Sequence, residues 1–198
     1  VTVNGDVLRT KDFSWNLNAN FSYNKNKITE LYNGVDEYEI ASANLKYVVG
    51  HSATEFYINR YAGVNPTNGD GEITTEFRDS DKVMTGKSFV APWQGGFGTT
   101  LTWKGISLAA QFSWVADRWV FNNDRYLDEG NGLFETYNQS SRLLYDRWKK
   151  PGDVTDIPRY GVTPQMDSRF LEDASFLRLK NLMLSYNFPQ TCSRRLIS

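Results

Sequence analysis

The sequence lacks a long apolar run, a cluster of cysteine or histidine, and an excess of charge of either sign. No apolar stretch approaches the ~20 residues of a membrane helix, and the mean hydropathy is -0.53, so a helical membrane protein is excluded. The 22 Lys and Arg residues nearly balance the 23 Asp and Glu residues, which leaves no field suited to binding nucleic acid. One cysteine, Cys192, permits neither an internal disulfide nor a cysteine metal cluster.

Catalytic motifs are also scarce. His51 is the only histidine, and no nucleophile motif lies near it. Acidic residues are plentiful, but their spacing alone identifies no catalytic pair. Asn68, Asp70 and Glu72 suggest a calcium loop, yet Pro66 occupies the place where an EF-hand needs an oxygen ligand. The sequence therefore predicts no enzyme, no metal site and no cofactor.

Aromatic residues are abundant instead, at 15% of the chain, and they occur in segments that alternate between apolar and polar residues. In the segment 95–116, apolar side chains recur at every second position on both sides of Lys104-Gly105. Since successive strand residues point to opposite faces, this pattern predicts a hairpin that reverses tightly at Lys104-Gly105. The second face of the hairpin carries Ser, Thr, Gln and Gly rather than the Lys and Glu usual on a soluble sheet.

The aromatic residues of these segments stand at both ends of one face. Trp93 and Trp103 are separated by ten residues, or ~33 Å along a strand. A tilt of about 40° reduces this length to about 25 Å, the height of the apolar band of a transmembrane β-barrel. The segment 13–24 repeats the pattern and carries four asparagines on its polar face, which suit a hydrated lumen because Asn is a poor strand former. A soluble sandwich can show the same alternation.

The segment 176–188 is the last predicted strand, and Pro189 is expected to end it. Strict alternation from Phe188 upward places Arg178 and Lys180 on the apolar face. Charges on a lipid-facing surface are costly at the middle of the bilayer and cheap near the headgroups. The pattern therefore predicts that only the lower part of this strand faces lipid.

The order of the elements predicts an all-β fold of antiparallel up-and-down strands. Strands are expected near 1–8, 13–24, 95–104, 106–116 and 176–188. Short turns then fall on one side, and the long loops 25–94 and 117–174 fall on the other, as in outer-membrane barrels with long extracellular loops. Five strands cannot close a barrel, so the chain is expected to form part of a large one. The first loop is polar and irregular, with short strand-like pieces such as 54–61 and turn clusters such as 65–71. A short helix is expected within 136–149.

Five stretches resemble the SusC/RagA family of TonB-linked outer-membrane proteins of Bacteroidetes. They are ASFLRLKNLMLSYNFP (174–189), DFSWNLNANFSYNKNKITEL (12–31), YAGVNPTNGD (61–70), GGFGTTLTWKGISLAAQFSW (95–114) and RWKKPGDVTDIPRY (147–160). The resemblance implies a plugged outer-membrane barrel that imports oligosaccharides or peptides with a SusD-like lipoprotein, powered by the TonB system. The plug domain, the TonB box and most strands of the family are absent, and the family continues beyond Pro189, so a fragment is expected.

The same resemblance places substrate and partner contacts on the long loops. The expected partners are the SusD-like lipoprotein, the TonB system through the missing N-terminal region, outer-membrane lipid, and a glycan or peptide, with no nucleic acid. Within the second loop, the predicted contacts are Trp119, Tyr126, Tyr137 and Trp148, since Trp and Tyr offer apolar area with a polar group. Packing within the loop is the alternative role of these residues. The alternative function is a soluble carbohydrate-binding or adhesin β-domain.

Overall fold

A computed structural model describes residues 1–40, 44–73, 82–132, 136–162 and 164–188, so the expected strand end at Pro189 and Cys192 lie outside the described residues. The chain divides into two units. We call the first, residues 1–25, 91–117 and 175–198, the wall unit, and the second, residues 26–90 and 118–174, the loop unit. Among the described residues, no helix has the length and apolar character needed to cross a membrane.

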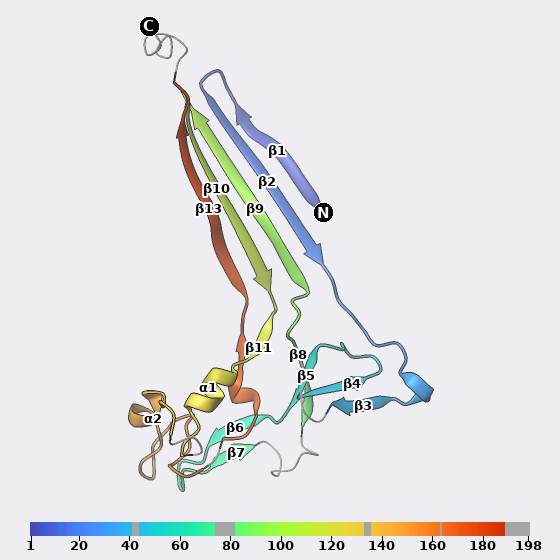
Figure 1. The fold of residues 1–198 in the computed structure, drawn as a ribbon, viewed down its shortest axis with the longest axis vertical. Coiled ribbons are helices and arrows are strands. Elements are labelled where there is room, and N and C mark those ends of the chain that lie inside the picture. The colour runs from blue at the N-terminus through green and yellow to red at the C-terminus, as the bar shows by residue number, and fades with distance from the viewer. Residues whose placement is uncertain (41–43, 74–81, 133–135, 163, 189–198) are drawn as a thin grey trace. The chain divides into compact units, whose positions relative to one another are not determined.

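The wall unit is a five-stranded antiparallel sheet in the order β1-β2-β9-β10-β13 (Figure 1). Its strands are β1 (Thr2–Arg9), β2 (Phe13–Tyr23), β9 (Trp93–Trp103), β10 (Ile106–Ala116) and β13 (Phe176–Tyr186). The first four lie beside their neighbours in chain order, and β13 adds to β10 after the second long loop. The predicted class, all-β with antiparallel up-and-down strands, is confirmed.

The register determines which strand ends lie together at each end of the wall sheet. Tyr23, at the end of β2, lies opposite Trp93, and Trp93 lies opposite Ala116. At the opposite end of these strands, Lys104 and Gly105 turn the chain with φ values of 46° and 89°, as a two-residue hairpin turn requires. Both short turns therefore lie at one end of the strands, and both long connections leave from the opposite end.

One face of the wall sheet is apolar and aromatic. Phe13 pairs with Trp103, and Phe97 pairs with Phe112, whose ring stacks on it at a centroid distance of 4.8 Å. We call this the apolar face, and the opposite face, with Asn and Ser at the intervening positions, the polar face. The predicted alternation is confirmed in β2, β9 and β10. β9 begins two residues earlier than predicted because Trp93 pairs with Tyr23, whose ring lies 4.2 Å away.

The placement of Arg178 on the apolar face was wrong. β13 contains a bulge, since Asn181 pairs with Gln111 while Leu179 pairs with the next residue, Phe112. Lys180 is the extra residue and has no partner in this register. A one-residue shift exchanges the two faces of a strand, so Arg178 lies opposite Ser113 on the polar face. The apolar face consequently continues over the full length of β13.

The first long loop is more regular than predicted, and the strand-like piece expected at 54–61 is confirmed by a strand over Glu55–Ile58. Its first part holds a four-stranded sheet in the order β3-β4-β5-β8 and a hairpin of β6 and β7. The bounds are β3 (Glu37–Ile40), β4 (Leu45–Val48), β5 (Glu55–Ile58), β8 (Val83–Ser88), β6 (Tyr61–Val64) and β7 (Gly71–Ile73), after the 3-10 turn η1 (Tyr32–Gly34). Buried backbone N–H and C=O groups need hydrogen-bond partners, and the strands of this loop provide them to one another because water cannot reach them.

The second part of the loop unit is mixed. β11 (Trp119–Phe121) pairs with β12 (Leu171–Asp173), and the helices are α1 (Asn123–Asp128), α2 (Arg142–Tyr145) and the 3-10 turn η3 (Ser168–Phe170). The helix expected within 136–149 is thus reduced to one turn, and α1 was not predicted. Among the described residues, the buried apolar side chains all belong to this unit: Phe56, Tyr57, Ile58, Leu143, Ile157, Phe170 and Leu171.

Candidate functional site

The loop unit is organised around a cluster of arginines and carboxylates that begins at α1. The side chain of Asn122 accepts a hydrogen bond from the Arg125 backbone at 2.9 Å and so caps the helix. Four residues after Arg125, just beyond the end of α1, stands Glu129, and residues at this spacing share one side of a helix. Arg125 Nε donates to Glu129 Oε1 at 2.9 Å.

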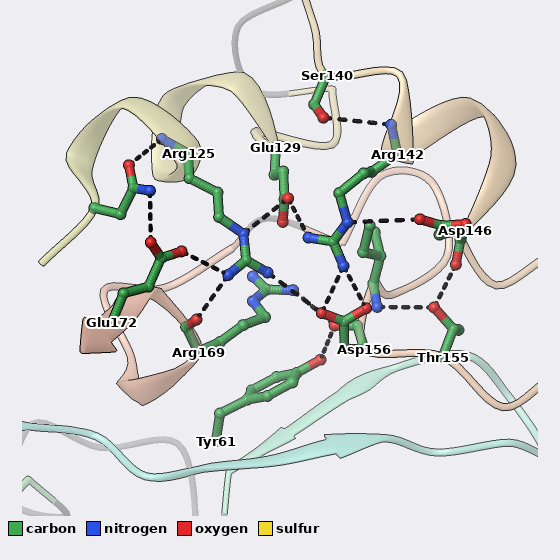
Figure 2. Close-up of polar contacts among 12 residues, drawn as sticks. Tyr61, Arg125, Glu129, Ser140, Arg142, Asp146, Thr155, Asp156, Arg169 and Glu172 are labelled. Carbon is green, nitrogen blue, oxygen red and sulfur yellow. Dashed lines mark hydrogen bonds and ion pairs between the residues drawn. The ribbon is translucent and has the colours of Figure 1, made fainter. Parts of the chain in front are cut away.

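Glu129 joins the guanidinium groups of two arginines, as Figure 2 shows. The Glu129 side chain is 1% exposed, and its Oε1 also accepts from Arg142. Nη2 of Arg142 donates to both carboxylate oxygens of Asp156 at 2.9 Å, and Nε of Arg142 lies 3.5 Å from Asp146 Oδ2. Arg125 also reaches Asp156 at 3.3 Å and Glu172 at 3.0 Å. Two arginines therefore pair with four carboxylates, Glu129, Asp146, Asp156 and Glu172, in one connected network.

The charges of this network set the ionisation of Asp156. Partial burial raises the pKa of this carboxyl, but the hydrogen bond and charge of Arg142 outweigh burial and hold the pKa below its ordinary value. Below the network, Tyr61 of β6 donates to the Asp156 carbonyl oxygen at 3.1 Å. Burial raises the pKa of Tyr61 to about 12, against the opposing charge of Arg169. Glu129 Oε2 and Arg169 Nε are buried without a hydrogen-bond partner among the described residues. The remaining contacts tie Tyr61 of the first long loop to Asp156 of the second, so the network holds the two long loops together.

Sequence patterns alone predicted little of this network. Arg125 and Glu129 have helical spacing, which is a detectable signal. Asp156 and Glu172, by contrast, lie 31 and 47 residues from Arg125, so only the folded loop brings them together.

Two of the four predicted contact residues pack inside the loop unit. Tyr126 on α1 lies 5.4 Å from the ring of Phe170, edge to face. Trp148 donates from Nε1 to the Pro66 carbonyl at 3.1 Å, and its ring covers Gly69 so closely that a Cβ atom there would lie 2.4 Å from it. Gly69 is therefore required by the tryptophan as well as by its positive φ of 76°.

The other two predicted contact residues are more accessible. Tyr137 is 71% exposed. Trp119 is half-buried, and Lys87 Nζ of β8 lies 3.5 Å from its ring centroid in a cation–π contact. The four residues thus have different neighbours, and the structure does not gather them into one site.

The polar face of the wall unit is a second candidate surface. Most of its residues carry an amide, a hydroxyl or no side chain: Asn16, Asn18, Asn20, Gly96, Gly98, Thr100, Thr102, Ser107, Gln111 and Ser113. The same face also carries the charged residues Asp6, Arg9 and Arg178 and the apolar residues Val115 and Met183. The absence of a side chain at Gly98 leaves room for Asn18, whose amide nitrogen would lie 2.8 Å from a Cβ atom there. Because amides and hydroxyls both donate and accept hydrogen bonds, such a face can bind polar solutes through either kind of contact.

Comparison with known proteins finds similarity over nearly the whole chain. No family model matches it. The chain is 28% identical to TonB-dependent receptor P26 of Formosa agariphila, over 95% of this chain and 21% of that protein. It is also 28% identical to TonB-dependent receptor SusC of Bacteroides thetaiotaomicron, over 94% of this chain and 20% of that protein. The chain therefore spans about a fifth of the length of these relatives.

Solved structures with the same fold are transporters. The structure of the RagAB peptide transporter superimposes with a TM-score of 0.87 and 33% identity, over 96% of this chain and 22% of the matched one. The RagAB peptide importer in its open-open state gives a TM-score of 0.86 at 33% identity. The relatives carry the names of receptors and transporters rather than enzymes.

Proposed function

The chain belongs to the SusC/RagA family of TonB-linked outer-membrane proteins, and from this premise we propose that it forms part of the barrel of an outer-membrane importer. The importer takes up oligosaccharides or peptides that are too large for porins. It acts with a SusD-like surface lipoprotein and draws energy from the TonB system. Its apolar face contacts lipid, its polar face lines the lumen, and its loop unit lies outside the cell.

The two-faced sheet of the wall unit is the observation that carries this proposal. Its apolar side chains are open rather than packed in a core, with Leu182 62% and Leu184 73% exposed. A soluble carbohydrate-binding or adhesin domain needs a closed core beneath such a surface, because a large exposed apolar patch promotes association. Lipid supplies the missing contact for a barrel wall.

Spin labels on neighbouring residues of β13 test the orientation. In the full-length receptor in outer membranes, a label at Leu184→Cys should collide with oxygen, which dissolves in lipid, more than with a water-soluble nickel chelate. A label at Ser185→Cys, one residue away on the polar face, should show the reverse preference. Equal preferences at the two sites would contradict a lipid-facing wall and favour the soluble alternative.

Uptake assays test the transport role and the substrate class. Cells with the full-length receptor should accumulate labelled oligopeptide or oligosaccharide, and deletion of the TonB system or of the lipoprotein should abolish accumulation. RagAB is described as a peptide transporter, which makes peptides the first substrate class to assay. Uptake that survives without TonB would contradict the proposed energy source.

The lipoprotein contact is proposed for the loop unit. Trp119, Tyr126, Tyr137 and Trp148 remain the proposed residues, and their surroundings rank them. Tyr137 is the most exposed of the four, whereas Tyr126 and Trp148 already contribute to packing. Tyr137→Ala should reduce co-purification of the lipoprotein at normal receptor abundance. Tyr126→Ala should instead reduce abundance, because it removes a core ring.

A further inference from the structure

The second part of the loop unit contains an open hollow with a volume of about 490 Å³. Its walls come from Asn131-Gly132, from residues between Gln139 and Arg147 on and around α2, and from Tyr160. The charged network described above does not line it. Apolar, aromatic, amide and cationic groups therefore surround one space of the size that small ligands occupy.

Asn131 provides an unused hydrogen-bond acceptor at this hollow. It is 2% exposed, and its amide nitrogen donates to the carbonyl oxygens of Pro158, Arg159 and Val162 at 3.5, 2.6 and 2.9 Å. Because carbonyl oxygens only accept, these contacts fix the amide orientation. Its Oδ1 is buried and accepts no hydrogen bond from the described residues. A buried acceptor without a partner is costly, so a ligand N–H group at this position would be favourable.

Arg147 provides a cation at the same hollow. Its guanidinium carbon lies 5.3 Å from the ring centroid of Tyr160. No carboxylate of the described residues pairs with it, in contrast to Arg125 and Arg142. A guanidinium that stacks on an aromatic ring keeps its in-plane N–H groups available for a carboxylate.

We propose that this hollow binds the carboxyl-terminal residue of a peptide whose last side chain is apolar. The terminal carboxylate pairs with Arg147, the amide N–H of the last residue donates to Asn131 Oδ1, and the side chain packs against Leu143, Leu144 and Tyr160. A neutral oligosaccharide would leave Arg147 without a counter-charge. The site rests on the proposed function and deepens it by choosing peptides as the substrate class.

Calorimetric titration of the purified full-length receptor with Ala-Ala-Leu tests the site. The same peptide with an amidated carboxyl terminus should bind at least about tenfold more weakly, because it lacks a charge-assisted hydrogen bond. Arg147→Gln should weaken binding of the free acid by a similar factor and leave the amide unaffected. Lys150→Gln is the matched control, since Lys150 is an exposed cation three residues away that does not line the hollow, and it should bind the free acid normally.

Cross-linking locates the binding event. A peptide with a diazirine analogue of leucine at its last position should label residues within 139–147 or Tyr160 on illumination. Leu144→Ala should weaken Ala-Ala-Leu but not Ala-Ala-Gly, which lacks the apolar side chain. Labelling confined to the polar face of the wall unit would overturn the proposal, and so would equal affinities for the acid and the amide.

Other ligands and uptake separate this proposal from the proposed function. If tri-galacturonate binds in an Arg147-dependent manner and the peptide does not, the hollow takes an acidic sugar and the peptide assignment fails. If neither ligand binds while TonB-dependent uptake persists, only the hollow proposal is overturned. If the peptide binds as expected and no TonB-dependent uptake occurs, the hollow stands and the import function fails.

Discussion

The wall unit and the loop unit use apolar side chains in opposite ways. In the wall unit Leu177, Leu182 and Leu184 of β13 are more than 60% exposed, whereas Ile58 and Phe170 of the loop unit are fully buried. The wall sheet therefore leaves its apolar face uncovered, as the proposed lipid-facing wall requires, while the loop unit buries a core of its own. The comparison shows that a long barrel loop need not be a flexible connection, because it can fold by the rules of a small water-soluble domain.

Polar groups differ between the two units in the same way. The polar face of the wall unit carries mainly neutral amides and hydroxyls, and its bulge keeps Arg178 off the apolar face. The loop unit instead holds Arg125, Arg142 and Glu129 in a network that excludes most water from the glutamate. Substitutions matched between the units can therefore test whether lipid or protein packing supplies the stability of each.

The largest effect is expected from Phe170→Ala in the loop unit. The ring is fully buried and touches Phe121 and Tyr126, so its loss should destabilise the loop unit by about 3–5 kcal/mol through lost burial and a cavity. Phe21→Ala on the apolar face is the matched control, with a ring that is 45% exposed. It should cost only about 1–2 kcal/mol, because fluid lipid fills the space and leaves no cavity. Hydrogen exchange of the full-length receptor measures both, and equal costs would remove the distinction between the units.

The next largest effect is expected from Leu182→Arg at the middle of the apolar face of β13. An arginine there should destabilise the barrel by about 2–4 kcal/mol, as charges do near the bilayer midplane. Asn181→Arg, one residue away and opposite Gln111 on the polar face, should cost far less because the lumen is hydrated. The comparison uses the amount of folded receptor in outer membranes and the guanidinium chloride concentration at the midpoint of its unfolding. An equal loss for both variants would mean that the two faces of β13 meet the same environment.

The wall was predictable because its signal is local. Alternation in 13–24 and 95–116 needs no knowledge of distant residues, since the period of two alone assigns each side chain to a face. The bulge at Lys180 could not be predicted in this way, because it has no sequence signature. One extra residue moves every strand residue beyond it to the opposite face. Strict alternation therefore placed Arg178 on the wrong face.

The loop unit was less predictable because its stabilising contacts are distant in sequence. Trp148 looked like a contact residue, but its partners Pro66 and Gly69 belong to the other long loop. Asp156 likewise looked like one of many surface acids until the fold brought it to Arg142. The strand-like piece at 54–61 indicated β5, but strands as short as β7 and β12 have too few residues for a clear period, so burial decides their structure rather than pattern.

Glu129→Gln tests the charged network with a smaller effect. The substitution keeps the shape of the side chain but removes the buried negative charge between Arg125 and Arg142. We expect a loss of about 2 kcal/mol, less than for a fully buried pair, because both arginines are partly exposed. Glu37→Gln breaks the pair with Lys46, in which the glutamate side chain is 60% exposed, and should change stability by less than about 1 kcal/mol. Resistance of the loop unit to a protease in intact cells measures both, and equal resistance would mean that the network adds nothing beyond a surface ion pair.

The smallest effect concerns the pH dependence of the loop unit, which the wall unit should not share. Asp167 is 2% exposed, and its carboxylate accepts a hydrogen bond from the Arg169 backbone at 2.8 Å. Burial raises the pKa of this carboxyl from 3.8 to about 6, against the opposing charges of Arg169 and Arg125. The folded state therefore binds a proton that the unfolded state releases between these two values. The resulting stabilisation is complete below pH 3.8 and is lost as the pH rises through about 6.

Between pH 5 and pH 7, Asp167 should make the loop unit about 1 kcal/mol less stable as the pH rises. Asp156 and Glu172, whose pKa values are lowered, act in the opposite sense only at more acidic pH, so this window isolates Asp167. Hydrogen exchange of the loop unit across the window, corrected for the intrinsic rate at each pH, should show this slope. Asp167→Asn should remove its contribution, because the amide does not ionise, whereas Asp153→Asn at an exposed turn should leave the slope unchanged. An unaltered slope in Asp167→Asn would show that the buried carboxyl stays ionised throughout, held by the arginines rather than neutralised by burial.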